Sequence, residues 1–202
     1  MIKLVILDRD GTLNQPADAE DFIASAEDWQ PLPGALEAVA RLGRAGWRVV
    51  LATNQPGLGR GLFDVSTLNA IHARLHKQLA ALGGRIDAIF YCPHTVDDAC
   101  ACRKPAPGLL EQICDRYRID PRSVPVVGSC AAHLHAGAAL GAPLHLVGSG
   151  ACNTSNRALP LPAGTQRHVD VAAAVEYLLA QDAAGAFAAP TAPKSARAAV
   201  SA

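Results

Sequence analysis

The sequence predicts an α/β fold in which a central parallel β-sheet carries helices on both faces. Short apolar runs rich in Val, Ile and Leu, typical of strands buried on both faces, alternate along the chain with segments of helical periodicity. Polar or glycine-containing segments follow the apolar runs, as expected at the carboxyl ends of strands in an open sheet. At 202 residues, half of them hydrophobic, the chain is long enough for one domain with a sizeable core.

The expected strands cover residues 2–7, 47–52, 86–91, 125–128 and 144–147, and the expected helices cover 34–45, 65–82, 107–117, 131–140 and 171–181. The first strand–helix–strand unit has the usual βαβ size, so its two strands are expected to be parallel neighbours. Loops are expected at 15–33, 56–61 and 148–164. Residues 183–202 have few large apolar side chains, so a disordered tail is expected after a domain spanning 1–182.

The first strand ends in the polar segment Asp8-Arg9-Asp10-Gly11-Thr12. Two carboxylates one residue apart at the tip of a buried strand point out of the open end of the sheet, where ligands bind in such folds. Gly11 allows the chain to turn sharply there. The alternative is a polar turn without chemistry.

The second strand ends in Thr53 and Asn54, which are expected beside Asp8 and Asp10 because the two strands are neighbours. A hydroxyl and an amide are neutral donors of the kind that a phosphoryl group needs. A simple strand-end turn is the alternative reading of Thr53 and Asn54. The glycines at 57–61 do not fit the dinucleotide pattern G-x-G-x-x-G.

The expected helix 65–82 carries an apolar stripe through Leu68, Ile71, Leu75, Leu79 and Leu82. His72 and His76 lie one turn apart on the same helix. Such a pair can bind a metal, but no third ligand lies nearby in the sequence. A solvated helix face is therefore the favoured interpretation of the two histidines.

Cys92, His94, Cys100 and Cys102 lie within eleven positions after the third strand. Sulfur and nitrogen ligands at this spacing match a closed tetrahedral zinc site, and four protein ligands make such a zinc structural. The loop 92–102 has few apolar residues, so a metal would supply its order. A chance cluster of free thiols is the alternative. Cysteines beside a histidine, in a chain without a secretory signal at its start, favour metal over disulfides.

Arg103 and Lys104 follow this loop and precede the helix 107–117. Cations at a helix N-terminus oppose the helix dipole, so their position favours a functional role over a plain charged helix entry. Lys104 is placed to offset negative charge at the strand tips. Arg103 can form a fork onto a phosphate or another substrate oxygen.

Three segments, in this order and spacing, carry a family resemblance: DRDGTLN, TNQPGLGRG, and CPH followed by CACRKPAPG. They resemble the haloacid-dehalogenase-like phosphatases, and within them the branch that acts on heptose bisphosphates and histidinol phosphate. The resemblance implies a Rossmann-like core with the zinc loop as a small lid. It also implies hydrolysis of a sugar bisphosphate, on the way to lipopolysaccharide core heptose, with histidinol phosphate as the alternative substrate.

The resemblance also implies roles for individual residues. Asp8 would be the nucleophile that forms an aspartyl-phosphate, and Asp10 the general acid and base. Mg²⁺ would be held by the Asp8 carboxylate and the backbone carbonyl of Asp10. Phosphate and substrate would be bound by Thr53, Asn54, Arg103 and Lys104.

The chain departs from the family pattern after the fourth strand. Where the family continues as GDxxxD, this chain reads GSCAAH, with Ser129 and His133 at the acidic positions. Mg²⁺ prefers hard anionic oxygens in octahedral geometry, so the neutral Ser129 hydroxyl predicts weaker Mg²⁺ binding. Three outcomes stay open: a slow phosphatase, a softer ion held by Cys130 with His133 or His135, or a sugar-phosphate-binding protein without turnover.

Charge and hydropathy exclude several function classes. Lys plus Arg equals Asp plus Glu, so the net charge of zero gives no global field toward nucleic acid or an anionic membrane surface. No apolar run reaches the length of a transmembrane helix, and the N-terminal segment does not have the pattern of a signal peptide. A cytoplasmic monomer that binds a small phosphorylated sugar is the expectation.

Overall fold

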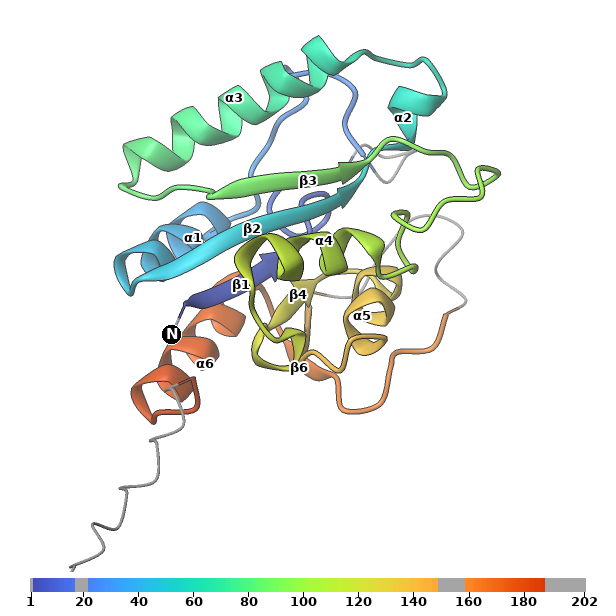
Figure 1. Ribbon diagram of the computed structural model, residues 1–202. Coiled ribbons are helices and arrows are strands. Elements are labelled where there is room, and N and C mark those ends of the chain that lie inside the picture. Colours follow the sequence, from blue (N-terminus) through green and yellow to red (C-terminus); the bar gives the residue numbers. More distant parts are fainter. Residues whose placement is uncertain (1, 17–21, 149–158, 188–202) are drawn as a thin grey trace, which may run out of the picture.

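The computed structural model describes residues 2–16, 22–148 and 159–187 (Figure 1). A six-stranded sheet in the order β3-β2-β1-β4-β5-β6 forms its centre, and every recorded strand pair is parallel. The strands are β1 (Lys3–Leu7), β2 (Trp47–Asn54), β3 (Ala88–Cys92), β4 (Val126–Gly128), β5 (Leu144–Val147) and β6 (Gln166–His168). The predicted α/β class with a parallel sheet is confirmed.

Helices cover both faces of the sheet, also as predicted. They are α1 (Ala35–Arg44), α2 (Pro56–Gly59), α3 (Val65–Ala81), α4 (Gly108–Tyr117), α5 (Ala131–Ala138) and α6 (Val171–Ala183), with a short 3₁₀ turn at Pro121–Ser123. Side chains of α1, α3 and α6 form one core with Val5 and Leu7 of β1. Side chains of α4 and α5 form a second core with Leu4 and Ile6, which point to the opposite face of the same strand.

The strand register brings the tips of β1, β2 and β4 to one edge of the sheet. Leu7 pairs with Leu51 of β2 and with Val127 of β4. The N–H of Asp8 donates to the carbonyl of Val127 at 3.0 Å. The polar segments that follow these three strands therefore meet at the carboxyl edge of the sheet, as the βαβ reading predicted.

Four local predictions need correction. The segment Gln166–His168 is a sixth strand, which was not predicted, and Pro56–Gly59 forms the helical turn α2 within an expected loop. His72 does not lie on a solvated helix face, because it is buried and its ring nitrogen accepts a hydrogen bond from Arg9. The stripe of α3 ends at Leu79, since Leu82 is exposed.

The folded chain extends beyond residue 182, where the sequence places the start of the tail. Helix α6 runs to Ala183, and the ring of Phe187 packs edge-on against Trp47 with the ring centroids 4.8 Å apart. The rest of the expected tail, 188–202, lies outside the described residues. So does most of the expected loop 148–164.

The loop after β1 contributes to the core as well as to the strand tips. Phe22, Ile23 and Trp29 are almost completely buried, and the indole N–H of Trp29 donates to Gln78 on α3 at 2.8 Å. Asn14 forms isolated bridges with Asp10 and Pro31, which close this loop over the end of β1. The loop is thereby fixed beside the carboxyl edge of the sheet.

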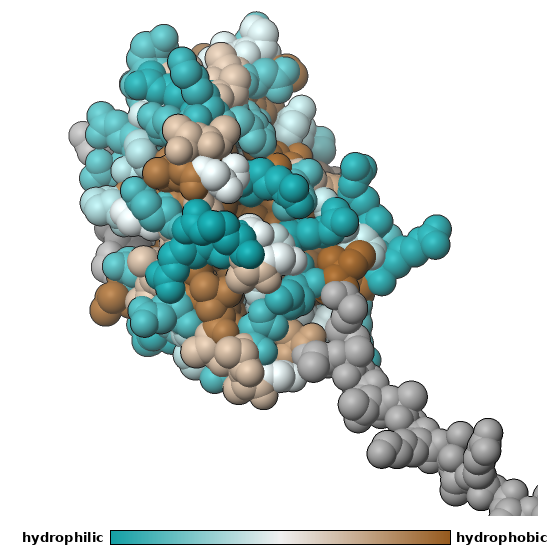
Figure 2. Space-filling model, turned by 90° about the vertical axis from the view of Figure 1, so that its left-hand side faces the viewer, coloured by the Kyte–Doolittle hydropathy of each residue, from teal (hydrophilic) through white to brown (hydrophobic). Residues whose placement is uncertain are grey.

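On the face shown in Figure 2, hydrophobic residues lie in small groups between hydrophilic ones. No helix among the described residues is long and apolar enough to cross a membrane.

Candidate active site

Asp8 and Lys104 form a buried ion pair at the tip of β1. The Lys104 ammonium lies 2.7 Å from Oδ1 of Asp8, and the two side chains are 2% and 8% exposed. Burial opposes the charged carboxylate, but the charge and hydrogen bond of Lys104 and the N–H of Arg9 outweigh it and lower the pKa of Asp8. Asp8 is therefore ionised near neutral pH, the state that a carboxylate nucleophile needs.

Asp10 is held by a buried arginine that the sequence analysis did not single out. Arg9 is completely buried, and its Nη2 donates to Oδ1 and Oδ2 of Asp10 at 3.1 and 2.9 Å. Its Nη1 donates to Nε2 of His72 at 3.0 Å, where burial and the Arg9 charge lower the pKa of His72 to about 3. The only sequence signal for Arg9 as the partner of Asp10 was its position between two carboxylates at a strand tip.

The residues that follow β2 divide between the two carboxylate sites. The hydroxyl of Thr53 lies 3.5 Å from Oδ2 of Asp10, and Gln55 donates to the same oxygen at 2.9 Å. Asn54 points elsewhere: its amide exchanges hydrogen bonds, both at 3.1 Å, with the backbone N–H and carbonyl of Lys104. The structure thus brings Thr53 to the carboxylates, while Asn54 fixes the backbone that carries Lys104.

Ser129 and His133 stand at the same edge, after β4. The N–H of Ser129 donates to the hydroxyl of Thr12 at 3.0 Å, and that hydroxyl lies 3.3 Å from the hydroxyl of Ser129. Gly11 has a φ of 74°, and a Cβ added there would come within 2.7 Å of Oγ of Ser129, so both the turn and the contact require glycine.

His133 is completely buried beside the ion pair. Its Nδ1 lies 3.2 Å from the Lys104 ammonium and 4.0 Å from Oδ2 of Asp8, while its Nε2 has no hydrogen-bond partner among the described residues. Burial and the Lys104 charge lower the pKa of His133 to about 3, so the imidazole is neutral near physiological pH. A Cβ on Gly128 would lie 2.7 Å from this ring, so glycine makes room for it.

The four predicted zinc ligands meet at one point. The ligand atoms of Cys92, His94, Cys100 and Cys102 all lie within 4.8 Å of one another. A tetrahedral site with Zn–S bonds of about 2.3 Å has edges of about 3.8 Å, close to the 3.8 Å between the sulfurs of Cys92 and Cys100. Burial and the neighbouring Cys102 raise the pKa of the Cys92 thiol to about 12 when no metal is bound. The donor set and spacing fit zinc.

Comparison with known proteins agrees with this geometry. A family model described as haloacid dehalogenase-like hydrolase matches residues 14–141. The chain belongs to the haloacid dehalogenase-like hydrolase family. Its relatives include the D-glycero-β-D-manno-heptose-1,7-bisphosphate 7-phosphatases of Bordetella bronchiseptica, 52% identical over 88% of this chain and 98% of that protein, and of Pseudomonas aeruginosa, 44% identical over 87% and 97%.

Solved structures of such hydrolases share the fold. The crystal structure of D,D-heptose 1,7-bisphosphate phosphatase from B. bronchiseptica, complexed with magnesium and phosphate, is 50% identical and superposes with a TM-score of 0.81, covering 89% of this chain and 99% of that one. The same enzyme from Burkholderia thailandensis is 45% identical with a TM-score of 0.66, covering 88% and 98%. These values place the whole described fold within the haloacid dehalogenase-like hydrolases.

The residues of this chain do not supply a magnesium site of the usual kind. Among the described residues, the only close group of three or more acidic, His or Cys ligands is the cluster at Cys92–Cys102. Both carboxylate oxygens of Asp10 accept hydrogen bonds, and Oδ2 of Asp8 faces the sulfur of Cys130 at 3.5 Å. One carboxylate, a thiol and an imidazole are a poor match for an ion that prefers six hard oxygens.

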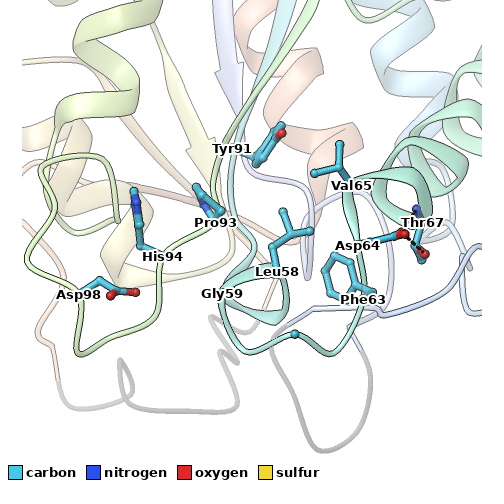
Figure 3. Close-up of a pocket in the computed structure, with 11 residues that line it drawn as sticks. Leu58, Gly59, Phe63, Asp64, Val65, Thr67, Tyr91, Pro93, His94 and Asp98 are labelled. Carbon is cyan, nitrogen blue, oxygen red and sulfur yellow. Dashed lines mark hydrogen bonds between the residues drawn. The ribbon is translucent and has the colours of Figure 1, made fainter.

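A cavity of about 830 Å³ opens beside the site, between the zinc loop and the α2–α3 connection (Figure 3). Leu58 and Gly59 of α2, Tyr91 of β3 and His94 of the zinc loop line it, together with Phe63 and Val65. None of Asp8, Asp10 and Lys104 lines this cavity.

Close packing at Gly59 joins the two walls of this cavity. The N–H of Gly59 donates to the carbonyl of Pro93 at 3.0 Å, and a Cβ on Gly59 would come within 2.7 Å of that oxygen. Arg103 supports the zinc loop from the other side, because its Nη1 donates to the carbonyl of His94 at 3.2 Å. The Arg103 guanidinium therefore contacts the zinc loop, and the fork onto a substrate stays a prediction.

Proposed function

We propose that this chain is a phosphoric monoester hydrolase that acts on D-glycero-D-manno-heptose 1,7-bisphosphate. Relatives at 40–52% identity bear this activity in their names, and the match covers almost their whole length. The observation that carries the proposal is the Asp8–Lys104 pair at 2.7 Å at the tip of β1, which provides an ionised carboxylate held by one fixed cation.

The proposed reaction has two steps on this chain's own residues. In the first, Asp10 takes up a proton from water when the phosphate dianion binds, Oδ2 of Asp8 attacks phosphorus, the bond from phosphorus to the sugar oxygen breaks, and Asp10 gives its proton to that oxygen. In the second, Asp10 takes a proton from water, which attacks the aspartyl-phosphate and releases orthophosphate with Asp8 regenerated. Arg9 and Gln55 hold Asp10 in place through both steps.

Other residues would bind the substrate and hold metals. Thr53, Arg103 and Lys104 would contact the phosphoryl group and the sugar, with Asn54 acting through the Lys104 backbone. Zinc on the cluster Cys92, His94, Cys100 and Cys102 would be structural, because no coordination position is left open. Magnesium would be held by Asp8 and the backbone carbonyl of Asp10 and would bind only weakly, because Ser129 offers a neutral hydroxyl where a third carboxylate is expected.

A second candidate, a sugar-phosphate-binding protein without turnover, is favoured by Ser129 and His133 at the acidic positions of the fourth motif. Phosphate release from heptose 1,7-bisphosphate, with histidinol phosphate as the competing substrate, decides between the two. The hydrolase predicts turnover that Asp8→Asn abolishes and that Asp115→Asn, an exposed carboxylate change on α4, leaves unchanged.

The Ser129→Asp variant separates the two candidates further. A wild-type chain that is inactive, together with a Ser129→Asp variant that turns over in Mg²⁺, would identify the natural chain as the binding protein. No turnover by either protein on either substrate would contradict the proposed substrate class.

A further inference from the structure

The charges at the carboxyl edge are balanced within the chain. Asp8 pairs with Lys104 at 2.7 Å, and Asp10 pairs with Arg9 at 2.9 Å. These four side chains are at most 8% exposed, so the pairs lie away from solvent and screening. Each of the two carboxylates therefore has a cation of this chain as its partner.

The third polar side chain beside Asp8 is His133, and its contacts show that it adds no charge. An ammonium group only donates hydrogen bonds, so the His133 Nδ1 at 3.2 Å from the Lys104 Nζ must accept one. A ring whose Nδ1 accepts carries its single proton on Nε2 and is neutral.

All three protons of the Lys104 ammonium have an acceptor. They are Oδ1 of Asp8 at 2.7 Å, the carbonyl of Ala52 at 2.8 Å and Nδ1 of His133 at 3.2 Å. Strand β2 and helix α5 thus hold the ammonium against Asp8 from two sides. The side of Asp8 that remains faces the thiol of Cys130 and the ring of His133, which are soft or borderline ligands.

We propose that this chain binds the phosphoryl group of its ligand without a divalent cation, with the charge of Lys104 offsetting that of Asp8 and with His133 as the positioning residue that holds the ammonium against Asp8. A site with excess carboxylate charge would repel a phosphate dianion unless a metal neutralised it. Here each carboxylate already has its own cation, so no excess charge remains to be neutralised. The inference rests on the proposed function only in taking a phosphate monoester as the ligand.

Calorimetric titration of the full zinc-loaded chain with orthophosphate, in buffer freed of Mg²⁺ without a soluble chelator and then in excess Mg²⁺, tests the proposal. Wild type should bind in the Mg²⁺-free buffer, with a Kd that Mg²⁺ changes by less than about threefold. Ser129→Asp adds an unmatched carboxylate and should weaken binding in the Mg²⁺-free buffer by about tenfold or more, with Mg²⁺ restoring it. The matched control Ser123→Asp adds the same charge just before β4, at the amino ends of the strands. It should change neither the Kd without Mg²⁺ nor the Kd with Mg²⁺.

Substitutions of His133 test its positioning role separately. His133→Leu removes the acceptor and should weaken orthophosphate binding in the Mg²⁺-free buffer by about tenfold. His133→Asn keeps an acceptor oxygen near the position of Nδ1 and should stay within about threefold of wild type. A thermal melt of each variant distinguishes loss of the acceptor from loss of the fold.

The outcomes separate this inference from the proposed function. Binding by the zinc-loaded wild type in Mg²⁺ but not in the Mg²⁺-free buffer would overturn the site without a divalent cation and leave the hydrolase proposal standing. Binding in neither condition would overturn both. Equal binding by folded His133→Leu and wild type would remove His133 from the proposal.

Discussion

Replacement of Arg9 by Met tests whether the buried pair at Asp10 stabilises the fold. The variant leaves the Asp10 carboxylate, 5% exposed, with neutral donors alone, because Asn14 and Gln55 still reach it at 3.0 and 2.9 Å. Removing one partner of a buried ion pair costs about 3–5 kcal/mol, and the remaining donors place the expected loss near 3 kcal/mol. For a chain of this length, the midpoint of thermal unfolding should fall by about 6–12 °C.

Urea unfolding of wild type and Arg9→Met at neutral pH measures this loss. The double variant Arg9→Met/Asp10→Asn should recover part of it, because an amide needs no cation. The matched control is Arg122→Met, whose pair with Asp120 is exposed and should have little measurable effect. A loss below about 1 kcal/mol for Arg9→Met would refute the reasoning, since it would mean that the buried carboxylate does not depend on its cation.

Three further predictions concern the zinc loop, a buried histidine and a glycine of α2. Metal analysis of the purified chain should find about one zinc, which Cys102→Ser removes and Cys114→Ser, a buried thiol outside the cluster, does not. Burial lowers the pKa of His145 to about 4, so between about pH 6.5 and pH 4 this histidine is protonated in the unfolded chain but neutral in the native chain. The unfolding free energy should therefore fall as the pH drops from about 6.5 to about 4. A denaturation series against pH should show that His145→Gln reduces this fall by up to about 3 kcal/mol. A Cβ on Gly57 would clash with the ring of Phe63 and lie 2.7 Å from the ring of Phe22, so Gly57→Ala should cost about 1–3 kcal/mol of stability in the same assay; an unchanged midpoint would show that the two rings have room to move.

The sequence was sufficient to predict the elements whose burial follows from their apolar residues. The apolar runs of β1, β2 and β5 and the stripe of α3 up to Leu79 lie where predicted, because a strand buried on both faces has no other pattern. Strand β6 was missed because Gln-Arg-His is short and polar, and its position at the sheet edge leaves it largely exposed. No local pattern distinguishes such a strand from a loop.

The sequence predicted which residues of the candidate site lie together, but it did not predict their hydrogen-bond partners. The neighbouring strand tips predicted that Asp8, Asp10 and Thr53 lie together, and Lys104 lies where a cation was expected. Arg9 and His72 pair across more than sixty positions of the chain, and a buried arginine has no signature in its own segment. Asn54 bonds to the Lys104 backbone for the same reason: the contact depends on the packing of β2 against the segment before α4.

Position 129 sets the charge balance of the site. The Thr12 hydroxyl donates to the serine hydroxyl at 3.3 Å, and the serine adds no charge. An aspartate carboxylate at this position accepts the same hydrogen bond, so the main effect of the change is an added negative charge with no cation of its own. The neutral Ser129 thus supports a site in which Lys104 and Arg9 carry the positive charge, and Ser129→Asp measures how much of that balance depends on one side chain.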